Sequence, residues 1–161
     1  MRVLDIVAGT SVDGPGLRTS IYLAGCSHRC PGCHNPQSWD FDAGREMSLG
    51  EIVEQVELNG FDVTLTGGDP LYHAAELVPL VREITSRGYT VWCYTGFTYP
   101  EVLDLPGCSE LLAMCEVLVD GPFIESQRDV SLTFRGSSNQ HLIDLHRSTP
   151  GNITLWTPED F

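Results

Sequence analysis

Residues 25–35 read Gly25-Cys26-Ser27-His28-Arg29-Cys30-Pro31-Gly32-Cys33-His34-Asn35, which places three of the six cysteines within eight residues, in the spacing C-x3-C-x2-C. Thiolates are soft ligands that select zinc, copper(I) or iron–sulfur clusters over hard cations. An ordinary 4Fe–4S cluster takes four cysteines, so a cluster held by three would leave one iron open to another ligand. The spacing also differs from the paired C-x2-C motifs of zinc ribbons.

A simpler site remains open from these residues alone. Cys26, Cys30 and Cys33 could join His28 or His34 in a structural zinc site with three thiolates and one imidazole. A disulfide framework is disfavoured, because nothing else in the sequence marks a secreted chain. Residues 1–6 lack the layout of a signal peptide, and no apolar run approaches the 18 or so residues of a membrane span. We therefore expect a cytoplasmic protein with reduced thiols.

Length and charge narrow the class of protein further. The chain has 161 residues, of which 42% are hydrophobic, and this suits a single domain over residues 1–161 with one core. A complete (β/α)8 barrel usually needs about 250 residues, so a fold derived from a barrel must be partial. The formal net charge of −13 disfavours nucleic acid as a partner, because an acidic surface repels phosphate backbones.

Hydrophobic patterns predict strands that alternate with helices. Ser48 to Glu51 form a capping box that begins a helix ending at Asn59-Gly60, and Pro79 is expected to kink or divide a later helix. Strands are expected at 4–7, 17–24, 63–66, 90–94, 116–119 and 153–156. Helices are expected at 73–87 and at 99–114, the second broken by Pro106-Gly107, and a short helix or strand is expected at 140–146. This alternation favours a mostly parallel α/β sheet.

Three polar or glycine-rich segments follow expected strands. In Gly67-Gly68-Asp69-Pro70 the glycines permit close backbone approach to a ligand, and the carboxylate can pair with an ammonium group, although such a segment is often a simple turn. Thr95-Gly96 and Asp120-Gly121-Pro122 also end strands, so they either line the same face or turn the chain. Residues 34 and 35 either contact a cofactor or begin a helix, for which asparagine is a common N-cap.

The remaining cysteines and one polar loop carry no metal pattern. Cys93, Cys108 and Cys115 lack ligand spacing and are expected to be packed thiols. The stretch from Arg135 to Gln140 is polar and typical of a loop, and its chemistry indicates no role.

The cysteine spacing resembles the signature of the radical S-adenosylmethionine superfamily, in which the amino and carboxylate groups of S-adenosylmethionine chelate the open iron. Residues 30–35, Cys-Pro-Gly-Cys-His-Asn, resemble the anaerobic ribonucleoside-triphosphate reductase activating proteins, which are glycyl-radical activases. Further landmarks resemble that family in the same order, at residues 12–18, 66–71, 94–96, 117–121 and 135–140. Gly32 stands where many superfamily members have an aromatic residue, and Asp69 replaces the glutamate of the usual Gly-Gly-Glu.

This resemblance implies a fold and a set of site residues. The fold is α/β, a single-domain partial (β/α) barrel of the radical SAM type, reduced in helices, with a cluster loop at 25–36. The implied metal ligands of one 4Fe–4S cluster are Cys26, Cys30 and Cys33. The implied contacts to S-adenosylmethionine are Gly32, Cys33, His34, Asn35, Gly67, Gly68, Asp69 and Thr95. Asp69 would pair with the methionyl amine.

The resemblance also implies a reaction and partners. The reduced cluster would cleave S-adenosylmethionine, and the resulting radical would take a hydrogen from a backbone glycine of an anaerobic ribonucleotide reductase. Cofactors then carry the difficult chemistry, so no acid or base side chain is needed. A one-electron donor such as flavodoxin would supply the electron. Two alternatives remain, namely another small radical enzyme such as a 7-carboxy-7-deazaguanine synthase, and a zinc-stabilised binding module without catalysis.

Overall fold

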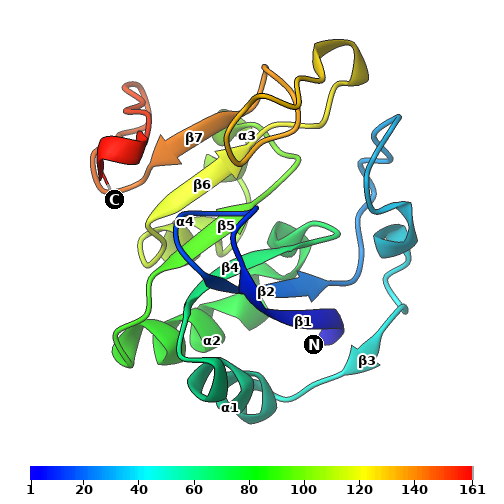
Figure 1. Ribbon diagram of the computed structural model, residues 1–161, viewed down its shortest axis with the longest axis vertical. Helices are drawn as coiled ribbons and strands as arrows, with labels where there is room; N and C mark the ends of the chain where they lie inside the picture. The colour runs from blue at the N-terminus through cyan, green and yellow to red at the C-terminus, as the bar shows by residue number, and fades with distance from the viewer. Residues whose placement is uncertain (161) are drawn as a thin grey trace.

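The computed structural model describes residues 1–160, which form a seven-stranded sheet flanked by short helices (Figure 1). The strands follow the spatial order β3-β1-β2-β4-β5-β6-β7. Their bounds are β1 Arg2–Thr10, β2 Arg18–Leu23, β3 Arg45–Glu46, β4 Asp62–Gly67, β5 Val91–Tyr94, β6 Val117–Asp120 and β7 His141–Asp144. The four central strands β2, β4, β5 and β6 are parallel, whereas β3, β1 and β7 pair antiparallel at the two edges. The predicted parallel pairing therefore holds for the centre of the sheet.

Within residues 1–160, four α-helices and three short 3-10 helices lie between these strands, and a fourth 3-10 helix follows β7. The α-helices are α1 Leu49–Asn59, α2 Ala74–Ser86, α3 Tyr99–Leu103 and α4 Cys108–Leu112. The 3-10 helices are η1 Pro36–Trp39, η2 Pro70–His73, η3 Glu125–Gln127 and η4 Pro158–Asp160. Figure 1 shows α1 and α2 side by side below the sheet, and a single apolar core joins their buried faces to it. Central strands read as nearly continuous apolar runs because both of their faces are covered.

The opposite face of the sheet has a small core covered by loops. Trp92, Val117 and Val119 pack there with Trp156. The guanidinium of Arg18 is buried beside them, where it donates to the Thr64 hydroxyl and the Val63 carbonyl, each at 2.9 Å. Burial lowers the pKa of Arg18, and the hydrogen bonds offset part of the cost of desolvating a cation.

Two local predictions about helices have different outcomes. The capping box is confirmed, because the Glu51 amide donates to Ser48 Oγ at 3.2 Å and the Ser48 amide donates to Glu51 Oε2 at 2.8 Å. Gly60 ends that helix in the left-handed conformation, with φ of 71°. The expectation that Pro79 divides the next helix is wrong, since α2 runs through it undivided. Pro79 is exposed, so its missing amide hydrogen bond lies on the solvent side while buried neighbours hold the helix.

The C-terminal segment differs from the prediction. Residues 153–156 do not form a strand; Leu155 makes one isolated bridge to Ile143 of β7. Trp156 instead turns its indole onto Trp92, with ring centroids 4.9 Å apart. The backbone on either side of this bridge still bonds to β7, because the Trp156 amide donates to the Leu142 carbonyl at 2.8 Å and the Asp144 amide donates to the Thr154 carbonyl at 2.9 Å. The ambiguous segment 140–146 contains strand β7, and the interruption predicted at Pro106-Gly107 separates α3 from α4.

Candidate functional site

An open hollow lies at the carboxyl ends of the four parallel strands, with a volume of about 160 Å³. The segments after β2, β4, β5 and β6 contribute to its wall, and Figure 1 shows the segments after β2 and after β6 rising toward the same upper right side. It is lined by Cys26, His28, Cys30, Cys33, Trp39, Thr66, Gly67, Gly68, Tyr94, Thr95, Gly96, Gly121, Phe123 and Gln140. The structure thus brings the three predicted cysteine ligands together with the Gly-Gly segment and Thr95.

The cysteine loop offers sulfur ligands that are partly exposed to this hollow. The Asn35 amide donates to Cys33 Sγ at 3.4 Å, and such hydrogen bonds tune a cluster. Burial raises the pKa of Cys26 to about 11, so binding of a metal there releases a proton. Within residues 1–160 no three His, Cys, Asp or Glu side chains are grouped as a single metal ion would require. Three soft donors around one hollow fit an iron–sulfur cluster with an open coordination position.

The position before the third cysteine is restricted by its surroundings. Gly32 has φ of +77°, a conformation that L side chains rarely adopt. A Cβ atom at this position would also lie 2.8 Å from the carboxyl group of Glu125. The Glu125 side chain therefore occupies the space in which an aromatic residue would otherwise stand.

Gly68 and Asp69, directly after β4, hold the end of β2 and the start of the cysteine loop. The Gly68 amide donates to the Leu23 carbonyl at 2.7 Å, and the Asp69 amide donates to the Gly25 carbonyl at 2.9 Å. A Cβ atom at Gly68 would lie 2.5 Å from the Gly25 oxygen. The sequence predicts that Gly67 and Gly68 let a ligand approach the backbone closely. In the structure it is the backbone of the cysteine loop that approaches Gly68 in this way, and Gly67 and Gly68 also line the hollow.

The Asp69 carboxylate is buried and bound by four groups of the protein. It accepts hydrogen bonds from the Leu71 amide at 3.0 Å, the Thr95 hydroxyl at 2.9 Å and the Gly96 amide at 2.9 Å. His28 Nε2 lies 2.6 Å from its Oδ2 atom. Only 1% of Asp69 is exposed, and it does not line the hollow. Its pairing with a ligand ammonium group remains a prediction.

Two other predicted residues lie beside the hollow and not in its wall. His34 packs against Phe123, with ring centroids 5.3 Å apart, and lines a neighbouring hollow. Asn35 precedes η1 but makes no side-chain capping hydrogen bond. A 3-10 helix therefore begins after residue 35, and contact of residues 34 and 35 with a cofactor remains a prediction.

Several lining residues were not predicted as contacts of a cluster or of S-adenosylmethionine, including Trp39, Phe123 and Gln140, and His28 was named only as an alternative zinc ligand. Gln140 is fixed by its own loop, because its Oε1 atom accepts from the Gly136 amide at 2.9 Å and its Nε2 atom donates to the Gly121 carbonyl at 3.1 Å. The chemistry of residues 135–140 predicts a polar loop and indicates no role for it. Its structural task is to fold back on the end of β6 and complete the wall.

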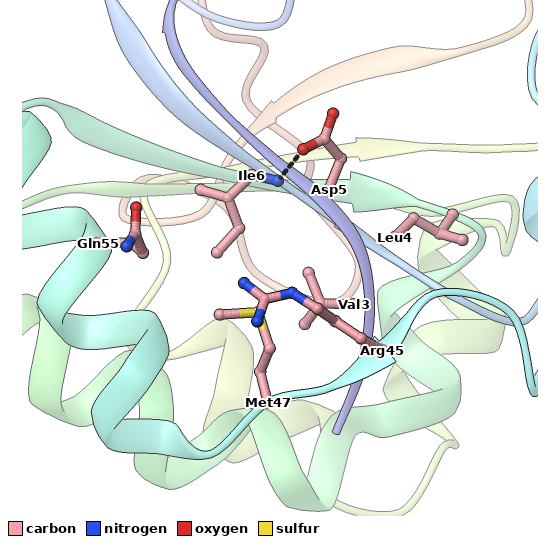
Figure 2. Close-up of a pocket in the computed structure, with 7 residues that line it drawn as sticks. All are labelled: Val3, Leu4, Asp5, Ile6, Arg45, Met47 and Gln55. Atoms are coloured by element: carbon pink, nitrogen blue, oxygen red, sulfur yellow. Dashed lines mark hydrogen bonds between the residues drawn. The ribbon is translucent and has the colours of Figure 1, made fainter.

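A separate hollow lies at the β3–β1 edge of the sheet, between these two strands and α1 (Figure 2). It has a volume of about 150 Å³ and is lined by Val3, Leu4, Asp5, Ile6, Arg45, Met47 and Gln55. Figure 2 shows the Arg45 guanidinium beside the Met47 side chain. This lining contains no cysteine and none of the predicted site residues.

The other three cysteines are buried in the helix-side core, as expected of packed thiols. Burial raises the pKa of Cys108 to about 11 and that of Cys115 to about 12, and it raises the pKa of Cys93 as well. A raised pKa leaves little thiolate at neutral pH. These side chains therefore serve packing.

Comparison with known proteins shows what the chain is similar to. The family described as "4Fe-4S single cluster domain" matches residues 12–143. The chain is 36% identical to the anaerobic ribonucleoside-triphosphate reductase-activating protein of Haemophilus influenzae, over 87% of this chain and 96% of that protein. It is 33% identical to the protein of that name from Escherichia coli K12, over 80% of this chain and 89% of the relative.

A solved structure shows the same fold. QueE from Escherichia coli aligns with a TM-score of 0.52 at 18% identity, covering 74% of this chain and 69% of QueE. The predicted α/β partial barrel with few helices is thereby confirmed. None of the helices in residues 1–160 has the length and apolar character needed to cross a membrane.

Proposed function

Because the chain belongs to the family of anaerobic ribonucleoside-triphosphate reductase-activating proteins, we propose that it activates such a reductase by generating a glycyl radical on it. The observation that carries this proposal is the convergence of Cys26, Cys30 and Cys33 with the Gly-Gly segment and Thr95 on one hollow. A 4Fe–4S cluster and S-adenosylmethionine are the cofactors of this activity. We propose residues 1–161 as one radical SAM domain, with the cluster loop at 25–36.

Each group of residues has a proposed task. The three cysteines hold the cluster, and Gly32, Cys33, His34 and Asn35 lie against S-adenosylmethionine from the loop side. Gly67, Gly68, Asp69 and Thr95 bind it from the ends of β4 and β5. When bound, these cofactors supply one-electron cleavage of a carbon–sulfur bond and the removal of a hydrogen from the partner's glycine.

The protein's own contribution is to position the ligands and to keep the cluster loop in place. Asp69 holds His28 of the cysteine loop and Gly96 after β5 at the same carboxylate, so it fixes two walls of the hollow relative to each other. Both oxygens of Asp69 already accept from protein groups and the residue is 1% exposed, so pairing with the methionyl amine requires that one of these partners moves. No acid or base side chain is needed for this reaction.

Partners and location follow from the proposed activity. The reductase is the protein substrate, and a one-electron donor such as flavodoxin supplies the electron. The acidic chain, with a net charge of −13, repels nucleic acid. We propose a cytoplasmic location, which agrees with six free cysteines because thiols stay reduced there.

Anaerobic reconstitution with iron, sulfide, dithionite and S-adenosylmethionine tests the proposal. We expect a brown protein that forms 5′-deoxyadenosine, and a glycyl-radical signal in electron paramagnetic resonance when a matched anaerobic reductase is present. A reductase whose radical-site glycine is replaced by alanine serves as the control and should give no signal. A colourless zinc protein, or turnover of a small purine-like molecule without any radical on the reductase, would refute the proposal.

A further inference from the structure

A second open hollow, with a volume of about 380 Å³, adjoins the cysteine hollow. Tyr94, at the end of β5, lines both, so the two hollows are adjacent there. Three separate loops form walls of the second hollow. The β1–β2 loop contributes Val12 and Asp13, the cysteine loop contributes His34, and the β6–β7 loop contributes Leu132, Phe134, Arg135 and Gly136. A chain lying there would reach the edge of the cofactor site.

The β6–β7 wall is held in an unusual backbone conformation. Phe134 has φ of 59°, one of two positive values among the non-glycine residues in 1–160, and such strain persists only where surrounding structure enforces it. The Tyr94 hydroxyl donates to the Phe134 carbonyl at 2.6 Å. Burial raises the pKa of Tyr94, so this hydroxyl stays a neutral donor. The strand that borders the cofactor site therefore fixes the wall of the second hollow.

The same wall carries a cation with unused hydrogen-bonding capacity. Arg135 Nη1 donates to the Gln140 carbonyl at 2.6 Å, while its Nε atom is buried without a hydrogen-bond partner in residues 1–160. A guanidinium has five N–H donors, and an unpaired buried donor calls for an explanation. Apolar side chains flank it, because Leu132 and Phe134 share its wall and Val12, 75% exposed, lies on the facing loop.

We propose that this second hollow receives the backbone of the reductase segment that carries the radical-site glycine, and that Arg135 donates to a main-chain carbonyl of that segment. The inference rests on the proposed function and names the docking place within it. A backbone segment fits because recognition needs a donor for carbonyl oxygens and apolar surface for flanking side chains, and the hollow supplies both. Its junction with the cysteine hollow at Tyr94 gives the segment its route to the cofactor.

The test uses the reconstituted protein and a synthetic peptide that spans the radical-site glycine of a matched reductase. We expect R135Q to raise the peptide Kd about tenfold or more and to lower the radical yield on the reductase. Formation of 5′-deoxyadenosine by dithionite-reduced protein alone should stay within about twofold of the unmodified protein. V12E changes an exposed residue on the facing loop and should raise the peptide Kd in the same way. Its effect does not depend on the folding of the β6–β7 loop.

R82Q is the matched control, because Arg82 lies on α2, is exposed and pairs with Glu110. Unchanged peptide affinity and radical yield in both R135Q and V12E would overturn the docking assignment while leaving the proposed function intact. Equal loss of 5′-deoxyadenosine and of peptide affinity in both variants would also overturn it, because the residues would then serve the cofactor site. Absence of any radical on the reductase with the unmodified protein would refute the proposed function, and this inference with it.

Discussion

His28 Nε2 lies 2.6 Å from Asp69 Oδ2, which ties the cysteine loop to the segment after β4. The imidazole also packs on Phe97, with ring centroids 4.5 Å apart. A Cβ atom at Gly96 would lie 2.6 Å from the same imidazole, so His28 fills the space between the ends of β4 and β5. The geometry of the cysteine loop therefore depends on a contact made 41 residues away.

Replacement of Asp69 by asparagine should affect both folding and cofactor binding. In D69N one carboxylate oxygen becomes an NH2 group, which is a donor and faces protein groups that are themselves donors. We therefore expect the free energy of unfolding to fall by about 1.5–3 kcal/mol. Urea unfolding of the metal-free protein under anaerobic conditions measures it. If Asp69 also pairs with the methionyl amine, the Kd for S-adenosylmethionine should rise about ten- to a hundredfold.

D104N is the control for this change, because Asp104 is exposed at the end of α3. It should unfold within about 0.5 kcal/mol of the unmodified protein. Stability and cofactor affinity that both stay unchanged in D69N would contradict the arrangement around the carboxylate. Lower stability with unchanged cofactor affinity would restrict Asp69 to holding the loop.

Each of the three loop cysteines should be essential for the cluster. Because three sulfur ligands already leave one iron open, none is spare, and C26A, C30A or C33A should each abolish iron retention and activation. Iron and sulfide analysis after anaerobic reconstitution gives the measurement. C93A, C108A and C115A are the controls and should keep the cluster, since their side chains are buried in the core. Loss of iron from a folded control variant would mean that the ligand set is wrong.

Much of the fold could be predicted from local sequence because its strands and helix caps are locally encoded. The capping box at Ser48 and the apolar runs of the central strands needed no tertiary information. The segment 153–156 pairs with β7 at a single bridge while Trp156 packs on Trp92, and the extent of such contacts between distant segments is a tertiary property that local patterns do not give. Division of the helix at Pro79 was wrongly expected because the exposure of its helix face, which decides how much the proline costs, is also a tertiary property.

The cysteine ligands of the site could be predicted from the sequence, whereas the residues that hold the cysteine loop in place could not. Cysteine spacing identifies the loop, and a carboxylate after two glycines marks a strand end. The partners of Asp69 come from two other segments, at His28 and at Thr95-Gly96, and no pattern in the sequence links them. The Arg135–Gln140 loop gave no chemical signal because its hydrogen bonds are mostly to backbone groups.

Addition of one methyl group at Gly68 should displace the cysteine loop. The new Cβ atom would lie 2.5 Å from the Gly25 carbonyl oxygen, and the obstructing atom is backbone that cannot rotate away. We expect G68A to bind substoichiometric iron and to unfold at lower urea than the unmodified protein. G151A is the control, because nothing lies within 4 Å of that position. Full iron content in G68A would show that the loop can shift without losing its ligands.

Alkylation should separate the two groups of cysteines. In the metal-free folded protein, iodoacetamide should modify the three partly exposed loop cysteines and spare the three buried ones, giving three adducts by mass spectrometry. Because the thiolate is the reactive form and burial raises the pKa of Cys26 to about 11, only about a thousandth of this thiol is ionised at pH 8. The rate at Cys26 should therefore rise about tenfold per pH unit between pH 7 and pH 10.

Unfolding in urea should raise the count from three adducts to six, which calibrates complete reaction. Reconstitution with iron and sulfide should protect the three loop cysteines, because a bound thiolate no longer attacks the reagent, and chelation of the iron should restore their reactivity. Protection of only two loop cysteines would exclude a site held by all three. Adducts at Cys93 or Cys115 in the folded protein would contradict their burial in the core, because a thiol must reach the reagent before its pKa matters.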